Sequence, residues 1–140
     1  MPLARQNFEE LGLPAGPYTH AVRHGQTIYT SGFTAFGTPA QADSAGPQIR
    51  AVFAQLHTIT AHYGRSLKDL VKVTVFVTDM TDLPEIRSAL AELYENEVPA
   101  SSLVCVAALF HPQLRVEVEA IIATLSMNDL QPDREIRIIP

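Results

Sequence analysis

The segment Val71–Val77 constrains the fold of this chain more than any other stretch. Valine occupies every second position, so one side of an extended chain is apolar, whereas Lys72, Thr74 and Phe76 lie on the other side. β-Branched residues favour strands, and a strand that is apolar on one side needs a cover over that side. The sequence therefore predicts a sheet with one buried face and one partly polar face.

Two amphipathic helices are predicted to supply this cover. The first begins at Pro47 and ends at Gly64, and the second begins near Asp82. Asp82 and Glu85 resemble a capping box, and Met80 is placed to pack against the first helical turn. The apolar residues recur at helical spacing: Ile49, Val52, Phe53, Leu56, Ile59 and Tyr63 in the first helix, and Ile86, Ala89, Leu90, Leu93 and Tyr94 in the second.

The other strands complete a β-β-α-β-α-β-β order. They are predicted at Tyr18–Val22, Thr27–Thr30, Ser102–Val106 and Val116–Thr124. Two helices can cover only one face of such a sheet, which gives an α+β fold. The opposite face carries Glu117 and Glu119 as well as Lys72. This face therefore either contacts water or is enclosed in an oligomer that forms clefts at its seams.

The composition excludes several classes of protein. Of the 140 residues, 46% are hydrophobic and 18% are charged, as is typical of a globular domain. No apolar run is long enough to span a membrane, the N-terminus lacks a signal core, and the single Cys105 forms no internal disulfide, so a cytoplasmic location is expected. We expect one domain over residues 1–125 and a tail over 126–140, in which the strand-like segment Arg134–Ile139 docks on the protein.

The charge balance argues against nucleic-acid binding. Ten basic and fifteen acidic residues give a net charge of −5, and the basic residues form no cluster in the sequence. A surface that binds nucleic acid neutralises phosphates with basic side chains. We therefore expect no nucleic-acid partner.

Four motifs follow one another between residues 14 and 124. They read G-P-Y-T-H-A-V at 16–22, I-Y-T-S-G at 28–32, V-K-V-T-V-F-V-T-D-M at 71–80 and V-E-V-E-A-I at 116–121. In this order and at this spacing they resemble the motifs of the RidA (YjgF/YER057c/UK114) family, whose third motif reads V-K-T-T-V-F-L-T-D-M. By this resemblance the chain is identified as a member of that family.

The resemblance implies a chorismate-mutase-like fold. It also implies a homotrimer whose three sheets form a central barrel, with one ligand cleft at each subunit interface. The activity it implies is hydrolysis of reactive enamines and imines to a 2-oxo acid and ammonia, without a cofactor.

The chain departs from the family at the residue that binds the substrate carboxylate. In the family this residue is the arginine of a Pro-Ala-Arg-Ser motif, which here reads Pro99-Ala100-Ser101-Ser102. Ser101 cannot replace a bidentate, permanently charged guanidinium, and loss of such a contact in a buried site costs about 2–5 kcal/mol. Standard 2-iminobutyrate deamination is therefore not expected. Leu103, where the family often has cysteine or threonine, is predicted to line the same cleft.

Arg87 is predicted to supply the missing positive charge. It aligns with a family asparagine that faces the cleft, and its neighbours three and four positions away are Leu83, Pro84, Leu90 and Ala91. None of these is acidic, so no local ion pair accounts for the arginine. The alternative is a solvated surface arginine. An anionic small molecule is the expected ligand.

The resemblance assigns three more residues to the cleft. Glu119 matches the family glutamate near the reacting atoms and would orient water or transfer a proton; its alternative is a structural role at a subunit seam, the role assigned to Glu117. Tyr18 is expected to wall the pocket and donate its hydroxyl, or else to be a core aromatic. Ser31 is expected to bond to a substrate oxygen, or else to be a turn residue.

Cys105, His20 and His111 are weaker candidates. Val104 and Val106 flank Cys105, which favours an inert thiol over a nucleophile. His20 replaces a family glutamine and His111 lies in a loop, so each is a candidate proton carrier. The histidines are scattered, with no ligand-like spacing to a carboxylate, so no metal site is predicted.

Two functional classes stay open. The first is a cofactor-free hydrolase or deaminase of an enamine, imine or related unsaturated carbonyl compound, in which Arg87 holds an anionic group and Glu119 orients water. The second is a non-catalytic trimer that binds a metabolite or acts in protection or regulation. Loss of the arginine at Ser101 favours the second class, and retention of Glu119 favours the first.

Overall fold

The computed structural model describes residues 2–124, so the predicted docking of Arg134–Ile139 lies outside the described residues. No helix among the described residues is long and apolar enough to cross a membrane. The strands are β1 (Leu3–Gln6), β2 (Ala21–His24), β3 (Thr27–Thr30), β4 (Leu70–Val77), β5 (Ala100–Cys105) and β6 (Val116–Ala123). The helices are α1 (Ala45–His62) and α2 (Leu83–Tyr94), with 3-10 turns η1 (Glu9–Leu11), η2 (Leu67–Asp69) and η3 (Met80–Asp82).

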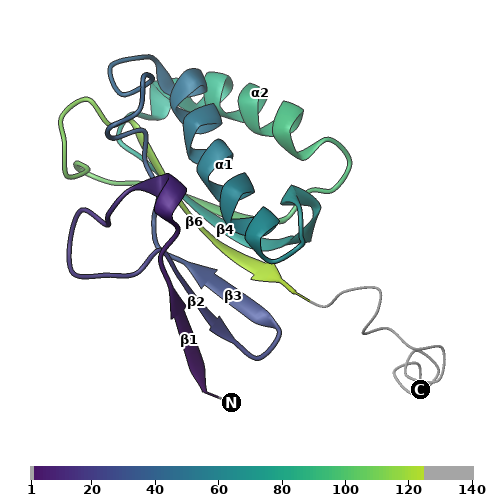
Figure 1. Cartoon of the computed structure of the whole chain (residues 1–140). Coiled ribbons are helices and arrows are strands. Elements are labelled where there is room, and N and C mark those ends of the chain that lie inside the picture. Colours follow the sequence, from purple (N-terminus) through teal and green to yellow (C-terminus); the bar gives the residue numbers. More distant parts are fainter. Residues whose placement is uncertain (1, 125–140) are drawn as a thin grey trace.

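The strands form one six-stranded sheet in the order β1-β2-β3-β6-β4-β5. Neighbouring strands are antiparallel except β4 and β5, which are parallel because α2 carries the chain back between them. Figure 1 shows α1 and α2 side by side on one face of the sheet, over β4 and β6, with β1, β2 and β3 extending beyond them. The predicted α+β class and the placement of both helices on one face are confirmed.

The core lies between the helices and one side of β4 and β6. The buried residues of the sheet include Val73, Val75, Val77, Val116, Val118 and Ile122, and those of the helices include Ile49, Val52, Phe53, Leu56, Ile59, Ile86, Ala89 and Leu90. One residue of the predicted alternation is wrong: Val71 is 50% exposed, and Leu70 takes the inner position. A shift in the β4–β6 register between Leu70 and Lys72 causes this exchange, because one extra residue reverses which side faces the helices.

The N-terminal part of the sheet differs from its prediction. β1 was not predicted, because all four of its residues are exposed and its sequence, LARQ, shows no alternation of apolar and polar residues. β2 begins at Ala21 rather than at Tyr18. The backbone N–H of His20, just before β2, instead donates to Oδ1 of Asn7 at 2.9 Å.

The predicted capping box at the start of α2 is also wrong. Asp82 forms an ion pair with Arg115 at 2.9 Å, and its side chain makes no capping bond. The Glu85 carboxylate accepts a hydrogen bond from the Ser44 hydroxyl at 2.7 Å and another from the backbone N–H of Gly46. Glu85 therefore caps the N-terminus of α1 rather than that of its own helix. These hydrogen bonds link the N-terminal end of α2 to the N-terminal end of α1.

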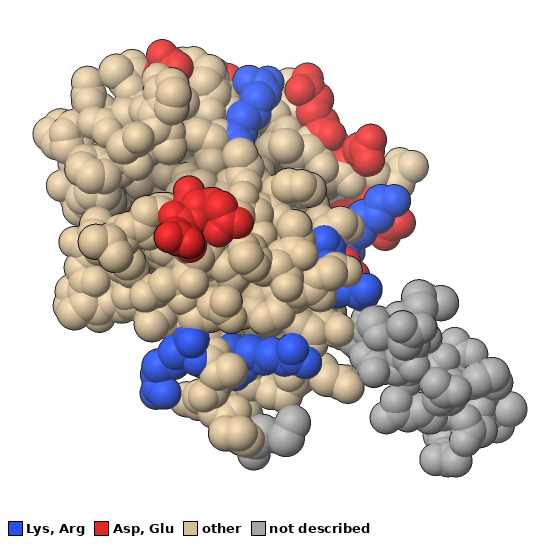
Figure 2. Space-filling view, viewed as in Figure 1, with Lys and Arg blue, Asp and Glu red and all other residues tan. Residues whose placement is uncertain are grey.

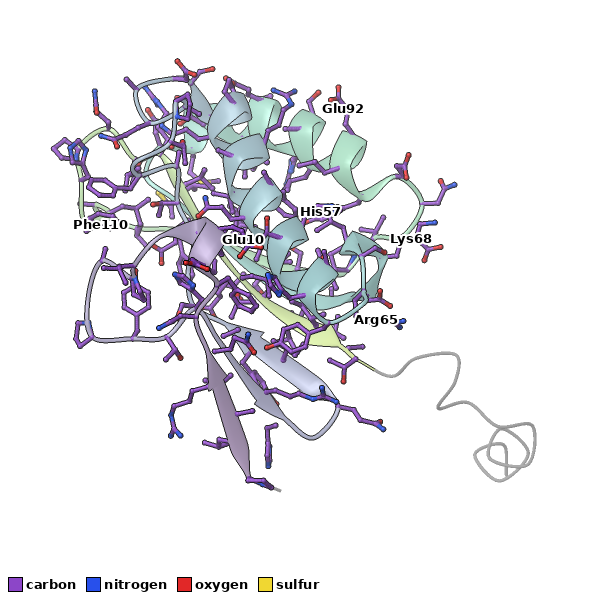
Figure 3. The ribbon with its side chains drawn as sticks, in the orientation of Figure 1. Glu10, His57, Arg65, Lys68, Glu92 and Phe110 are labelled. Atoms are coloured by element: carbon purple, nitrogen blue, oxygen red, sulfur yellow. The ribbon has the colours of Figure 1, made fainter. Side chains whose placement is uncertain are left out.

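His20 fixes the N-terminal segment to the domain. The backbone N–H of the buried Phe8 donates to Nδ1 of His20 at 2.9 Å, and the His20 side chain is itself only 3% exposed. Glu10 pairs with His62 of α1 at 2.9 Å, and Figure 3 shows Glu10 on the turn that faces this helix. Burial disfavours the charged imidazolium and lowers the pKa of His20 below its ordinary value of 6.5.

We predict that His20 makes the fold sensitive to mild acid. The unfolded chain binds the His20 proton more tightly than the folded chain, so this contribution to the free energy of unfolding is complete above about pH 6.5 and is lost as the pH falls below it. His20→Gln keeps a hydrogen-bond acceptor for Phe8 without a titrating ring, and should flatten the slope of unfolding free energy between pH 7 and 5. Chemical denaturation across this range measures the slope. The exposed His24→Gln should leave it unchanged; an equal effect of both substitutions would contradict the assignment.

Candidate functional site

The face of the sheet that points away from the helices carries the polar side chains of β4 and β6. In the antiparallel register, Thr74 lies opposite Glu119 and Phe76 lies opposite Glu117. Directly opposed residues share a face, and their neighbours Val73, Val75 and Val77 are buried under the helices. Glu117 and Glu119 therefore lie on the open face.

A bulge between β3 and β6 shapes one edge of this face. Tyr29 lies opposite Ile121, and Phe33 next lies opposite Val118, so the three residues 30–32 oppose the two residues 119–120. Inside the bulge the backbone N–H of Ser31 donates to the carbonyl of His20 at 3.0 Å. Bulges of this kind redirect side chains and occur beside functional sites. Ser31 is thereby held next to the chain segment that carries Tyr18.

The Glu117 carboxyl packs against Gly32 in this bulge. A Cβ atom at Gly32 would collide with the Glu117 carboxyl, so a larger residue here would require that side chain to move. Burial raises the pKa of Glu117 above its ordinary value of 4.5, and the charge of Glu119 raises it further. Glu117 forms no hydrogen bond or ion pair with the described residues. From the sequence it was assigned a structural role, because the family resemblance assigned the reactive glutamate to Glu119 instead.

Tyr18 and Ser31 both line a shallow hollow of about 620 Å³ beside this bulge. The Tyr18 side chain is 45% exposed, which excludes the alternative of a core aromatic. Its hydroxyl accepts a hydrogen bond from Ala15 N–H at 3.2 Å, so its own proton is free to be donated. The Ser31 hydroxyl donates to the carbonyl of Thr19 and is left as an acceptor. Arg5 of β1 also lines the hollow, a residue that no sequence signal indicated.

The other predicted cleft residues lie on the opposite side of the sheet. The parallel register places Ser101 beside Val73 and Leu103 beside Val75, on the side of the helices. Cys105 follows in the same row and is exposed, because β5 is the edge strand. Arg87 is exposed on α2 and forms no hydrogen bond or ion pair with the described residues.

One chain therefore contains two separate groups of predicted site residues. Tyr18, Ser31 and the two glutamates lie on the open face around the β3–β6 bulge, and β4 separates them from β5. The second group, Arg87, Ser101, Leu103 and Cys105, lies on the helix side. Within one chain these groups do not meet.

The two histidine candidates differ in their surroundings. His20 is buried and its Nδ1 is already an acceptor, so it is not a freely exchanging proton carrier in this state. His111 lies in the loop before β6, where its Nδ1 accepts a hydrogen bond from Gln113 N–H at 3.1 Å and its ring lies 5.6 Å from that of Phe36. Within residues 2–124, no group of three or more His, Cys, Asp and Glu side chains is placed to hold a metal ion.

The charged side chains of the described residues do not form a broad basic surface on the face that Figure 2 shows. Lys and Arg lie there in small separate groups among acidic and uncharged residues, with one group over β1 and β2.

Comparisons with known proteins agree with this architecture. The model of the family described as Endoribonuclease L-PSP matches residues 10–124. A 2-iminobutanoate/2-iminopropanoate deaminase of Dermatophagoides farinae is 32% identical over 112 residues, which cover 78% of this chain and 87% of that protein. The 3-aminoacrylate deaminase RutC of Acinetobacter baylyi is 29% identical over 111 residues, or 77% of this chain and 87% of that protein.

A solved structure also resembles this chain in its fold. The crystal structure of a Mycobacterium tuberculosis member of the YjgF/YER057c/UK114 family superimposes with a TM-score of 0.74 at 27% identity, covering 87% of this chain and 99% of that one. The matched region contains all four motifs and both groups of predicted site residues. The chain therefore belongs to the Endoribonuclease L-PSP family, that is, to the RidA (YjgF/YER057c/UK114) family.

Proposed function

We propose that this protein is a cofactor-free RidA-type hydrolase that deaminates a small enamine, imine or related unsaturated carbonyl compound in a cleft between two copies of the chain. The observation that carries the proposal is the half-buried Glu117 carboxyl, packed on Gly32 beside Ser31, where Gly32 lines a pocket together with Tyr18. A carboxyl with a raised pKa and no internal partner is suited to proton transfer. Relatives named as deaminases support the reaction class.

A second copy of the chain would complete the cleft. The group around Glu117 and the group around Ser101 lie on opposite sides of the sheet, so a neighbouring subunit must bring its Ser101 and Arg87 to the open face. Tyr29 and Val104 are large apolar residues on that face, 46% and 43% exposed in the single chain. Burial of such a face between copies would remove this apolar surface from water, and a homotrimer is the assembly we propose.

The chemistry assigns a role to each side of the cleft. Water adds to the carbon of the C=N bond, a proton passes to nitrogen, and the C–N bond breaks to release ammonia and leave a carbonyl. Glu117 would accept the proton of the attacking water and return it to the leaving nitrogen. Tyr18 O–H would donate a hydrogen bond to a substrate oxygen. The Ser31 hydroxyl cannot do so, because its proton is already donated to the carbonyl of Thr19.

Glu119 stays the candidate that family resemblance indicates. It is exposed on the open face opposite Thr74, and its charge raises the pKa of Glu117. The substrate carboxylate would bind Arg87 of the neighbouring subunit, which is exposed and unpaired among the described residues. Ser101 would contribute only a neutral hydroxyl at the position of the family arginine.

A non-catalytic binding trimer is the second candidate function. Ser101 favours this function, because it replaces the arginine that binds the substrate carboxylate in other family members. The hollow lined by Tyr18 and Ser31, completed at the subunit interface, would then bind a metabolite without hydrolysing it.

Substitution of each glutamate should separate their roles. Glu117→Gln should lower kcat by about 10²- to 10⁴-fold, because the proton-transferring group is lost. Glu119→Gln should lower kcat less and move the acidic limb of the pH–rate profile to lower pH, because removal of its charge lowers the pKa of Glu117. Imines generated in the assay by an amino-acid oxidase, with the 2-oxo acid measured, provide the readout. The reverse ranking would assign the reaction to Glu119, and no hydrolysis above background by the unmodified protein would favour the binding trimer.

The standard short substrate tests the role of Ser101. The protein should hydrolyse 2-iminobutanoate much more slowly than a relative with the Pro-Ala-Arg-Ser motif, by about 30-fold or more if one buried charged contact is missing. Ser101→Arg should raise kcat/KM for this substrate, and Ser102→Arg, one position along the strand on the other face, should not. Equal rates for the unmodified protein and the relative would show that the arginine is dispensable.

Mixed oligomers test whether the cleft lies between subunits. Arg87→Ala and Glu117→Gln should each be nearly inactive alone, whereas a mixed trimer that contains both variants should regain about a third of the unmodified activity, because one of its three clefts combines two intact halves. Co-expression with two different tags allows the mixed species to be purified. Recovery of no activity in a verified mixed trimer, or a monomer in light scattering at micromolar concentration, would contradict the intersubunit cleft.

A further inference from the structure

A second, smaller pocket lies behind Tyr18 and Gly32. It has a volume of about 100 Å³ and is bordered by the N-terminal segment, the loop after β3 and Gln55 of α1. Tyr18 and Gly32 line it, and Tyr18 also lines the larger hollow. Because Glu117 packs against Gly32, a ligand group in this pocket would lie close to the carboxyl proposed to act in the reaction.

Aromatic side chains form much of its wall. Phe36 and Phe110 meet edge to face, with ring centroids 5.0 Å apart, and the buried Phe33 lies with its ring 5.8 Å from that of His20. Phe110 lies in the loop between β5 and β6, at the outer edge of the molecule (Figure 3), and is 61% exposed. Such aromatic surface at a pocket mouth favours an apolar ligand group.

His20 places one hydrogen-bond donor on this pocket. It lines the pocket, and because its Nδ1 accepts from Phe8 N–H, the proton of the neutral ring is on Nε2. Nε2 forms no hydrogen bond with the described residues. Among them, only the hydroxyls of Tyr94 and Thr124 are fully buried side-chain atoms without a partner. The Nε2–H group is therefore not sealed from solvent, and it belongs to a residue that borders the pocket.

The pocket offers no full charge. No Asp, Glu, Lys or Arg lines it, and burial lowers the pKa of His20, which keeps its ring neutral at physiological pH. The amide nitrogen of Gln55 already donates to the carbonyl of Thr34 at 2.8 Å, and the Thr34 hydroxyl accepts from Phe36 N–H at 3.2 Å. The unused side-chain donors thus include His20 Nε2–H and the hydroxyls of Tyr18 and Thr34, which each accept a hydrogen bond and keep their own proton.

We infer that this pocket binds an uncharged ligand group with a branched or cyclic hydrocarbon body and a carbonyl oxygen that accepts hydrogen bonds from His20 Nε2–H and Tyr18 O–H. A cavity of about 150 Å³ accommodates benzene, so 100 Å³ suits a body of about four carbons. The inference rests on the proposed function, because the ligand group bound in the pocket is taken to be part of the substrate that reacts at Glu117. It distinguishes the substrate from the short imino acids, which have no such body.

Isovaleramide is a probe of this chemistry, and its binding is measured without any turnover. Titration of the intact protein, followed by two-dimensional NMR or calorimetry, should show saturable binding with a Kd of about 1 mM, reasonable for a ligand of seven heavy atoms. Acetamide, which lacks the branched body, should bind at least tenfold more weakly, since each buried methylene contributes about fourfold. Isovalerate, which has the body but carries a charge, should also bind more weakly in an Arg87→Ala background, where the proposed carboxylate site is removed.

Substitutions assign the binding to the pocket. His20→Leu should weaken isovaleramide binding about five- to tenfold, the usual effect of losing one hydrogen bond, and His20→Gln should restore most of it through its amide N–H. Phe110→Ala should weaken binding by a similar factor, and its exposure makes loss of the fold a minor concern. The matched controls are His24→Leu and Val98→Ala, which alters a similarly exposed apolar residue outside the pocket lining. Thermal unfolding of every variant separates loss of fold from loss of binding.

The outcomes separate this inference from the proposed function. Isovaleramide binding that depends on His20 and Phe110, in a protein that hydrolyses no imine, would support the pocket and reject the hydrolase. Imine hydrolysis without isovaleramide binding, or with binding that neither substitution changes, would reject the pocket and leave the hydrolase standing. In the Arg87→Ala background, tighter binding of isovalerate than of isovaleramide would also overturn the inference, because it would indicate an anion site in the pocket itself.

Discussion

The two-residue alternation of side chains along β4 and β6 determines most of what this protein can do. It directs Val73, Val75 and Val77 towards the helices and leaves Glu117 and Glu119 on the open face. A slip of one residue would bury the glutamates under the helices, at a cost far above the stability of a small domain. The apolar core thus holds the carboxyl groups on the surface that a neighbouring subunit can cover.

The site depends on a local exception to this regularity. The bulge at residues 30–32 breaks the β3–β6 ladder, which brings Ser31 next to the carbonyl groups before β2 and places Gly32 under the Glu117 carboxyl. The resulting half-site is open, with a free Tyr18 hydroxyl on one side and the His20 pocket behind it. The residues on β5 and α2 lie beyond β4, so the reaction we propose needs a second chain.

The strongly periodic segments of the sequence predicted their structures well, because burial enforces the period: both helices, β4 and β6 are where they were expected. β1 could not be predicted, because it is exposed and held only by pairing with β2. The capping prediction failed because the Glu85 partner, Gly46, lies 39 residues away in sequence and meets it only through packing of α1 on α2. Sequence also could not rank Glu117 above Glu119, since their difference in burial arises from contact with Gly32 across the sheet. The Arg87, Ser101 and Leu103 assignments stay predictions.

The central claim, that Ser31 and Ser101 of different subunits face each other across one cleft, has a direct test. In a Cys105→Ser background, which removes the single natural cysteine, Ser31→Cys and Ser101→Cys are combined and treated with a short bis-maleimide. Denaturing electrophoresis should then show covalent dimers and trimers at low protein concentration, and neither single-cysteine variant should form them in quantity. Cross-linking confined to the monomer band, in a protein whose two cysteines have both reacted, would contradict the intersubunit cleft.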